Sequence, residues 1–177
     1  MSNYCEIAKH DMTHIEYHDH EYGFPIKDDN LLFERLSLEI MQAGLSWTLV
    51  LKKRKELKRA FSEFCINSVA KYDEHDFSRL LTNTKIIRNK LKIAAIIKNA
   101  QIIQDIQNQN GNFINWIDKH HPLSRKEWVK LFKVTFQFTG EKITGEFLMS
   151  IGYTSGAHKP ECPIYKKIML LNPPWSQ

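Results

Sequence analysis

The chain has 177 residues, 42% of them hydrophobic and 25% charged, so it can bury a core and is globular rather than disordered or fibrous. Its 25 Lys and Arg against 20 Asp and Glu give a net charge of +5, a modest preference for an anionic partner such as nucleic acid. No apolar run reaches membrane-spanning length and the N-terminus has no apolar signal core, so we expect a cytoplasmic protein without a membrane partner. The odd number of cysteines, three, favours thiols or metal ligands over disulfides.

Helical periodicity dominates the chain and little of it is typical of strands. In chain order we expect helices over residues 31–43, 48–64, 73–83, 86–110, 112–121, 124–136 and 141–151. Asp73 is a plausible N-cap, Ser124 and Glu127 form a capping box, and Gly44 ends the first long helix. The spacing of the fourth helix predicts an inner stripe of Ile86, Ile87, Leu91, Ala94, Ile97 and Ile103.

No repeat or linker interrupts these segments, so the sequence predicts one all-α domain over residues 1–177. The two ends, residues 1–22 and 153–177, lack a clear period and are expected to be irregular.

A carboxylate interrupts the apolar face of the first long helix. Glu39 falls in the middle of the face formed by Leu32, Leu36, Ile40 and Ala43. Taken alone, such a glutamate is more often paired with a buried arginine, or marks a wrong helix phase, than functional. The alternative is that this face forms the floor of a pocket.

Two Cys and two His near the chain ends are candidate metal ligands. Cys5 and the triplet His18-Asp19-His20 lie near the start, and His158 and Cys162 form an H-x3-C near the end. Two thiolates and two imidazoles make a closed tetrahedral set for Zn²⁺, which favours a structural ion over a catalytic one. Such an ion would tie the two ends together.

Alternatives to this set remain open on spacing alone. His14 and His20 are rival ligands, and neither half of the set matches a C-x2-C finger pattern. The simplest alternative is that Cys5 and Cys162 are ordinary thiols and the histidines are surface residues.

Six features together resemble the 3-methyladenine DNA glycosylase I family. They are the N-terminal Cys, YHDHEYG at 17–23, LEIMQAGLSW at 38–47 followed by TLVLKKR, IIRNKLKIAAIIKNA at 86–100, FQFTG at 136–140, and the terminal H-x3-C. The resemblance covers nearly the whole chain and implies an all-α helix-hairpin-helix fold. It also implies a monofunctional, monomeric base-excision repair enzyme that releases free 3-methyladenine from alkylated double-stranded DNA, with a cytoplasmic, nucleoid-associated location.

The resemblance also assigns roles to residues in the pocket and at the metal. It implies that one structural zinc ion is held by Cys5, His18, His158 and Cys162, rather than by His14 or His20. It implies that Glu39 hydrogen-bonds the extruded base and that Tyr17 and Trp47 sandwich it. Tyr22 and His14 occupy the positions of two further pocket aromatics.

The DNA-binding residues that the resemblance implies form a tip and a hairpin. Gly44 and Leu45 resemble the tip that fills the gap left in the base stack, and Gly140 resembles the hairpin that holds a phosphate through main-chain N–H groups. Nearby lysines that could contact phosphates are Lys52, Lys53 and Lys142.

The chain departs from the family pattern at several positions. Ile7, His14 and Tyr22 replace family aromatics, the hairpin carries one glycine, and Gly145 and Glu146 stand where a tyrosine and a serine are common. Residues 147–160 contain no Asp or Glu, so the superfamily's usual catalytic aspartate has no counterpart. Glu39 is therefore expected to bind and stabilise charge rather than act as a strong base.

Two other classes of function remain open. The altered pocket would suit a zinc-stapled DNA-binding module that has lost its glycosylase activity. A metal-dependent hydrolase is the second alternative, which the closed four-ligand set disfavours because a catalytic zinc keeps an open position.

Overall fold

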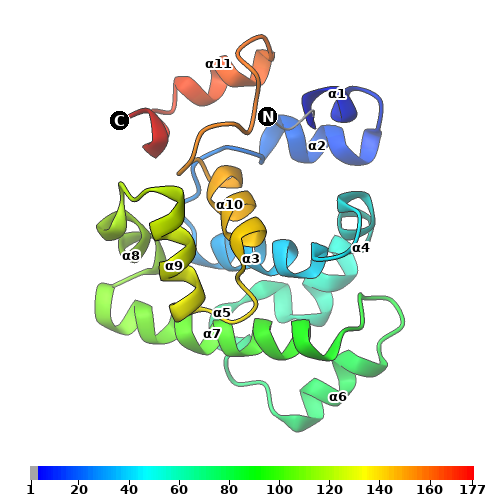
Figure 1. Ribbon diagram of the computed structural model, residues 1–177. Helices are drawn as coiled ribbons and strands as arrows, with labels where there is room; N and C mark the ends of the chain where they lie inside the picture. The colour runs from blue at the N-terminus through cyan, green and yellow to red at the C-terminus, as the bar shows by residue number, and fades with distance from the viewer. Residues whose placement is uncertain (1–3) are drawn as a thin grey trace.

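The computed structural model describes residues 4–177, and over that range it contains helices and loops but no strand (Figure 1). The α-helices are α1 (Tyr4–Lys9), α2 (Met12–His20), α3 (Asp29–Gln42), α4 (Trp47–Ala60), α5 (Ile66–Val69), α6 (Glu74–Thr82), α7 (Lys90–Asn110), α8 (Phe113–His120), α9 (Arg125–Thr135), α10 (Glu141–Ser150) and α11 (Pro163–Met169). Single 3-10 turns lie at Ser62–Phe64 and Pro174–Ser176. The all-α prediction is thus confirmed for the described part of the chain. None of the helices there is both long and apolar enough to cross a bilayer.

Helix α3 lies at the centre of the fold. Every residue from Leu32 to Met41 is buried, and the helix packs against α4, α7, α8 and α10. In Figure 1, α10 lies in front of α3 and α7 runs beneath both. Because neighbouring helices cover α3 on all sides, the predicted apolar face is only part of its buried surface.

A buried lysine fixes the end of α3. The Nζ atom of Lys92, on α7, donates to the carbonyl oxygens of Met41 at 2.8 Å and Ala43 at 2.5 Å. These carbonyls would otherwise lack partners at the helix end. Gly44 then turns the chain with a φ of +76°, which leaves Gly44, Leu45 and Ser46 exposed.

Helix α7 differs from its prediction in its start and in part of its inner face. It begins at Lys90 rather than at residue 86, because the Asn89 side chain caps it. Of the predicted inner stripe, Ile86 and Ile103 are buried and Ile87 and Ile97 pack against the core, but Leu91 is 68% exposed and Ala94 is also exposed. Apolar residues occupy every position from 93 to 97, so their period does not fix which of them turn inward.

The prediction of irregular chain ends is wrong for much of both segments. The N-terminal part forms α1 and α2, the latter capped by Asp11, and the C-terminal part forms α11. Residues 1–3 of this prediction lie outside the described residues. The two ends meet at one end of the molecule (Figure 1), where Cys5 and Cys162 pack with Ile164 and Ile168.

Candidate active site and metal centre

A cavity of about 200 Å³ is lined by side chains from both halves of the chain. Its walls carry Tyr4, Tyr17, Tyr22, Glu39, Gln42, Trp47, Lys142 and Glu146. These residues come from α1, α2, the turn after α2, α3, the start of α4, and α10. The structure therefore brings together Glu39, Tyr17, Trp47 and Tyr22, as the sequence predicted, although their contact with a base stays a prediction.

Glu39 is buried, with 4% of its surface exposed, and lines the cavity. Among the described residues it forms no ion pair or hydrogen bond, so the paired-glutamate alternative is wrong. Burial raises the pKa of Glu39 to about 8, and the neighbouring carboxylate of Glu146 adds to the rise, while Arg35 and Lys142 oppose it. In the empty cavity Glu39 is therefore mostly protonated at neutral pH.

The arginine nearest in sequence to Glu39 binds other groups instead. Arg35 donates to the Tyr17 hydroxyl at 2.7 Å and to the Glu21 carboxylate at 2.9 Å, and its guanidinium lies 4.6 Å from the centre of the Tyr17 ring. Arg54 donates to the same Glu21 and to Glu34. This ion network joins the end of α2 to α3 and α4, and it holds the Tyr17 ring in place at the cavity wall.

Tyr17 and Trp47 do not form an open sandwich in this structure. Their ring centres lie 5.1 Å apart with the planes at 61°, an edge-to-face contact. A base stacked between two aromatic rings needs parallel rings about 7 Å apart, since each stacking distance is close to a van der Waals contact of about 3.5 Å. Binding between these two rings would therefore require the half-buried Trp47 to turn.

His14 does not line the cavity, so its predicted place in the pocket is wrong. It is buried behind Tyr4, whose hydroxyl lies 3.0 Å from the His14 Nδ1 atom. The His14 Nε2 atom lies 2.8 Å from the Thr48 hydroxyl on α4. Meanwhile Ile7 is 53% exposed. Tyr4 thus forms part of the cavity wall, and its contact with His14 holds it there.

The predicted tip, Gly44 and Leu45, lies close to the predicted hairpin turn at Gly140. Leu45 is 38% exposed at the tip, and a further cavity beside the pocket is lined by Gly44 and Gly140 together. Gly140 is the N-cap of α10 and provides no side chain, so the first N–H groups of α10 have no side-chain cap. Both glycines have open space where a Cβ would be added.

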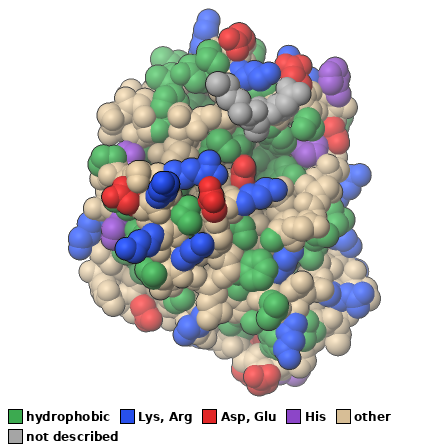
Figure 2. Space-filling model, viewed as in Figure 1, with side chains coloured by type: hydrophobic (Ala, Val, Ile, Leu, Met, Phe, Trp, Pro, Cys, Tyr) green, Lys and Arg blue, Asp and Glu red, His purple; other side chains and the backbone are tan. Residues whose placement is uncertain are grey.

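The three lysines that were predicted to contact phosphates differ in the exposure of their side chains. Lys52 and Lys142 are exposed, whereas Lys53 is half-buried. Figure 2 shows basic side chains gathered across the middle of one face of the molecule, with acidic side chains among them. This mixture favours local phosphate contacts over a broad basic surface.

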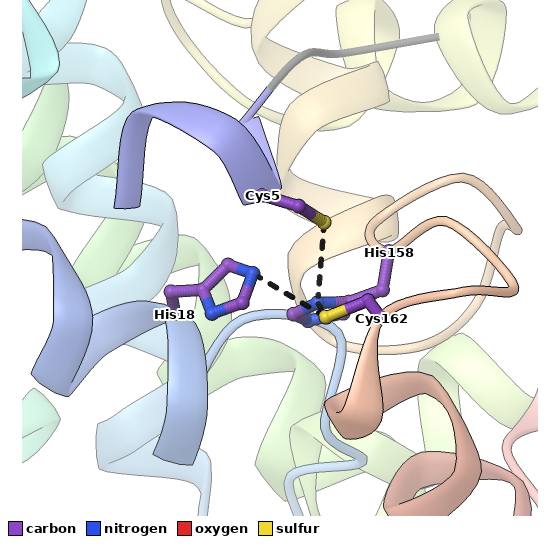
Figure 3. A group of neighbouring side chains, drawn as sticks. All are labelled: Cys5, His18, His158 and Cys162. Carbon is purple, nitrogen blue, oxygen red and sulfur yellow. Dashed lines mark hydrogen bonds between the residues drawn. The ribbon is translucent and has the colours of Figure 1, made fainter. Parts of the chain in front are cut away.

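The four predicted zinc ligands converge on one point between the chain ends (Figure 3). Their ligand atoms all lie within 4.8 Å of one another. Cys162 Sγ lies 3.6 Å from His158 Nδ1 and 3.8 Å from His18 Nε2, and Cys5 Sγ lies 3.8 Å from His158 Nδ1. Bonds of about 2.0–2.3 Å at tetrahedral angles place neighbouring zinc ligands about 3.3–3.8 Å apart, so the residues fit this ion.

Outer hydrogen bonds orient both imidazoles toward that point. His158 Nε2 lies 2.7 Å from the Tyr22 carbonyl and His18 Nδ1 lies 2.6 Å from the Asp19 carboxylate, which directs the other ring nitrogen inward. Burial lowers the pKa of His158 and so favours its neutral, metal-binding form. His14 binds Tyr4 and Thr48 instead, and His20 is exposed, so neither rival belongs to the cluster.

The model of the methyladenine glycosylase family matches residues 7–165 of the chain. The protein belongs to the methyladenine glycosylase family. Relatives and solved structures agree with this membership. A DNA-3-methyladenine glycosylase of Haemophilus influenzae is 33% identical over 182 residues, which cover 92% of this chain and 98% of the relative. DNA-3-methyladenine glycosylase 1 of Escherichia coli is 40% identical over 113 residues, 64% of this chain and 60% of the relative.

Solved structures of the same family share the fold. The 3-methyladenine DNA glycosylase I of Staphylococcus aureus aligns with a TM-score of 0.81 at 29% identity, over 92% of this chain and 96% of its own. A Tyr-to-Phe variant of a 3-methyladenine DNA glycosylase I in complex with 3-methyladenine aligns with a TM-score of 0.81 at 28% identity, over 92% of this chain and 97% of its own. Membership of this methyladenine glycosylase family makes the protein an enzyme of the DNA glycosylase class, which acts on N-glycosyl bonds.

The sequence alone did not identify all residues that line the cavity around Glu39. Tyr4, Gln42 and Glu146 line it but were not predicted to do so, and Lys142 lines it although we expected a phosphate contact. Gln42 lies three residues after Glu39 on α3, a helical spacing that could have revealed it. Tyr4 lies beside the ligand Cys5, and nothing in the local pattern shows which way its ring points.

Proposed function

We propose that this protein releases 3-methyladenine from alkylated double-stranded DNA by hydrolysing its N-glycosyl bond. The observation that carries the proposal is Glu39, a buried carboxylate without a partner among the described residues, in a cavity walled by aromatic side chains. An enzyme that acts on a base must take it out of the stack and read its polar edge within a pocket. The relatives and solved structures described above bear names that agree with this substrate.

The charge of the base explains why a buried carboxylate suits this cavity. Methylation at N3 of the adenine in a nucleoside gives a cation, which is already a good leaving group and needs no general acid. The cation would stabilise the ionised form of Glu39 and so offset the burial that raises its pKa. The electron-rich rings of Tyr17 and Trp47 attract a cation in addition.

We further propose that α9, the turn after it and α10 act as the helix-hairpin-helix element that grips the DNA backbone. Gly140 would allow a phosphate to approach the first N–H groups of α10, and Lys142 lies in the same first turn. Leu45 would fill the space that the extruded base leaves. A zinc ion held by Cys5, His18, His158 and Cys162 would be structural, because four protein ligands complete its coordination.

The proposal is tested by incubating the protein with methylated duplex DNA and separating the free bases by chromatography. We expect the wild-type protein to release 3-methyladenine, and Glu39→Gln to release it about 10- to 100-fold more slowly, because a hydrogen bond to a charged group is worth roughly 1.5–3 kcal/mol. Duplex binding without release of any base would favour the alternative of a DNA-binding module that has lost its activity.

A further inference from the structure

We propose that Glu146 is a specificity-determining residue of the cavity, which adds a second negative charge beside Glu39 and selects a positively charged purine over a neutral one. This inference rests on the proposed function, because it assumes that the cavity receives the base. Glu146 stands at a position where the family commonly has a residue without charge, so the effect would be particular to this chain.

The packing of α10 against α3 places Glu146 in the cavity. Its half-buried side chain lines the same cavity as Glu39, although the two residues come from opposite halves of the chain. The Tyr22 hydroxyl donates to its Oε2 atom at 3.5 Å, the long limit of a hydrogen bond. Among the described residues Glu146 forms no ion pair, so its charge is not neutralised by a close partner.

The groups around Glu39 leave the cavity negative when a base is bound. The titratable and charged side chains that face Glu39 are Tyr4 on α1, Tyr17 on α2, Tyr22, Arg35 on α3, and Lys142 and Glu146 on α10. Glu21 already shares the charge of Arg35, at 2.9 Å. Lys142 is exposed near the start of α10, where water and salt screen its charge. Glu39 and Glu146 then remain for the base.

The carboxylates of Glu39 and Glu146 line the same cavity, so the charge of Glu146 affects the pKa of Glu39. Burial is the largest cause of the raised pKa of Glu39, and the charge of Glu146 is the second largest. Glu39 therefore tends to hold its proton until a cation binds nearby. A positively charged purine would interact favourably with both carboxylates. A neutral purine would gain nothing from the second charge and would meet a protonated Glu39.

Two small purines that differ in charge test the inference by binding alone. In 9-methyladenine the base is neutral, whereas 3,9-dimethyladenine carries a fixed positive charge and has a methyl group where the sugar would be attached. We expect calorimetry to show that Glu146→Gln weakens binding of 3,9-dimethyladenine about tenfold, the effect of losing one close opposite charge, while binding of 9-methyladenine changes little.

Glu141→Gln is the matched control, because it removes the same charge from the same helix at an exposed residue, which within residues 4–177 forms an ion pair only with exposed Arg125. We expect this variant to keep the wild-type ratio of the two affinities. A Glu146→Gln variant that folds and also keeps that ratio would show that Glu146 serves only to hold Tyr22, and would overturn the inference.

The pH dependence of the wild-type protein provides a test that needs no variant. Affinity for 3,9-dimethyladenine should rise as the pH rises through the pKa of Glu39, about 8, because the ionised carboxylate attracts the cation. Glu146→Gln should move this rise to lower pH, because it removes a charge that raises that pKa. A wild-type affinity that stays constant between about pH 6 and about pH 9 would contradict the inference. Because neither probe requires bond cleavage, failure of the proposed excision activity would be seen separately.

Discussion

Burial raises the pKa of Glu39 to about 8, whereas a glutamate in an unfolded chain titrates at about 4.3. Between these values the unfolded chain has lost this proton and the folded protein still holds it. The contribution of Glu39 to the free energy of unfolding is therefore fully present below the pKa of the unfolded chain, and it is lost as the pH rises through the pKa of the folded protein. The ionised Glu39 carboxylate, which would bind a cationic base, thus destabilises the folded protein at alkaline pH when no cation is bound beside it.

Glu39→Gln should remove this pH dependence. At pH 8 we expect the variant to be more stable than the wild-type protein by about 4–5 kcal/mol, a rise in melting temperature of roughly 10–15 °C for a chain of this size. Below about pH 3, where Glu39 is protonated in both states, the two proteins should melt alike. Thermal melting at several pH values provides the measurement, and an equal loss of stability at every pH would show that Glu39 is a structural residue.

Leu45 provides a second prediction at the scale of single residues. Its side chain is 38% exposed at the end of a turn that Gly44 and the Lys92 hydrogen bonds hold in place. Leu45→Ala should slow release of 3-methyladenine from duplex DNA roughly tenfold, and slow it less from single strands, because only a duplex leaves a gap to fill. Equal slowing on both substrates would exclude this role for Leu45.

At the scale of elements, Asn99 on α7 braces the turn between α9 and α10. This fully buried side chain donates to the Gln137 carbonyl at 3.0 Å and accepts from the Gln137 N–H at 2.8 Å. Thr139 adds a hydroxyl bond to the Phe132 carbonyl at 2.8 Å. The shape of the turn is therefore determined by a helix that lies distant from it in the sequence.

Asn99→Ala should weaken DNA binding more than it weakens binding of free 3-methyladenine. Losing two partly buried hydrogen bonds costs about 2 kcal/mol and loosens the turn, while the cavity that contains Glu39 keeps its walls. Gln104→Ala on the same helix is the control, because in the described part of the chain the Gln104 side chain bonds only to the exposed side chain of Asn67. Fluorescence anisotropy on a duplex would measure the difference, and unchanged DNA affinity would contradict a gripping role for this turn.

The sequence predicted helices better where capping residues marked their ends. The Asp73 cap and the Ser124–Glu127 box form as expected, and α3 and α4 lie close to their predicted bounds. The predicted inner face of α7 was wrong at Leu91 and Ala94, because the helix has too many apolar residues for their spacing to show which ones are buried. Helices α1 and α2 were missed because their apolar residues are few and do not form a stripe.

The site was predictable from the sequence only in part, for a similar reason. Glu39 and the four cluster residues have distinctive chemistry, so the family pattern could assign them. Tyr4 lines the cavity and His14 does not, because tertiary contacts decide which ring reaches it: the hydroxyl of Tyr4 lies 3.0 Å from His14, and the His14 ring lies 2.8 Å from the Thr48 hydroxyl. No local spacing encodes that arrangement.

At the scale of the whole molecule, the Cys5–His18–His158–Cys162 cluster joins the chain ends beside the base cavity. His158 binds the Tyr22 carbonyl, and Tyr4 precedes Cys5, so the cluster supports two residues of the cavity wall. We propose that the purified protein contains one zinc ion per chain.

Cys162→Ser should lower the zinc content and the melting temperature, the latter by several degrees, because the ion closes a long loop that is otherwise free in the unfolded chain. Cys65→Ser is the control, since Cys65 lies outside the cluster. Metal analysis by mass spectrometry with thermal melting would measure both effects. A wild-type protein that contains no metal would contradict the zinc proposal.

The most direct test of the base cavity is a crystal structure of the protein with 3-methyladenine. We predict that the base lies in the cavity with its exocyclic amine donating to the Glu39 carboxylate, and with the Trp47 ring turned to stack on it. Binding instead in the larger neighbouring cavity of about 400 Å³, lined by Arg125, Trp128 and Thr154 among others, would contradict the account.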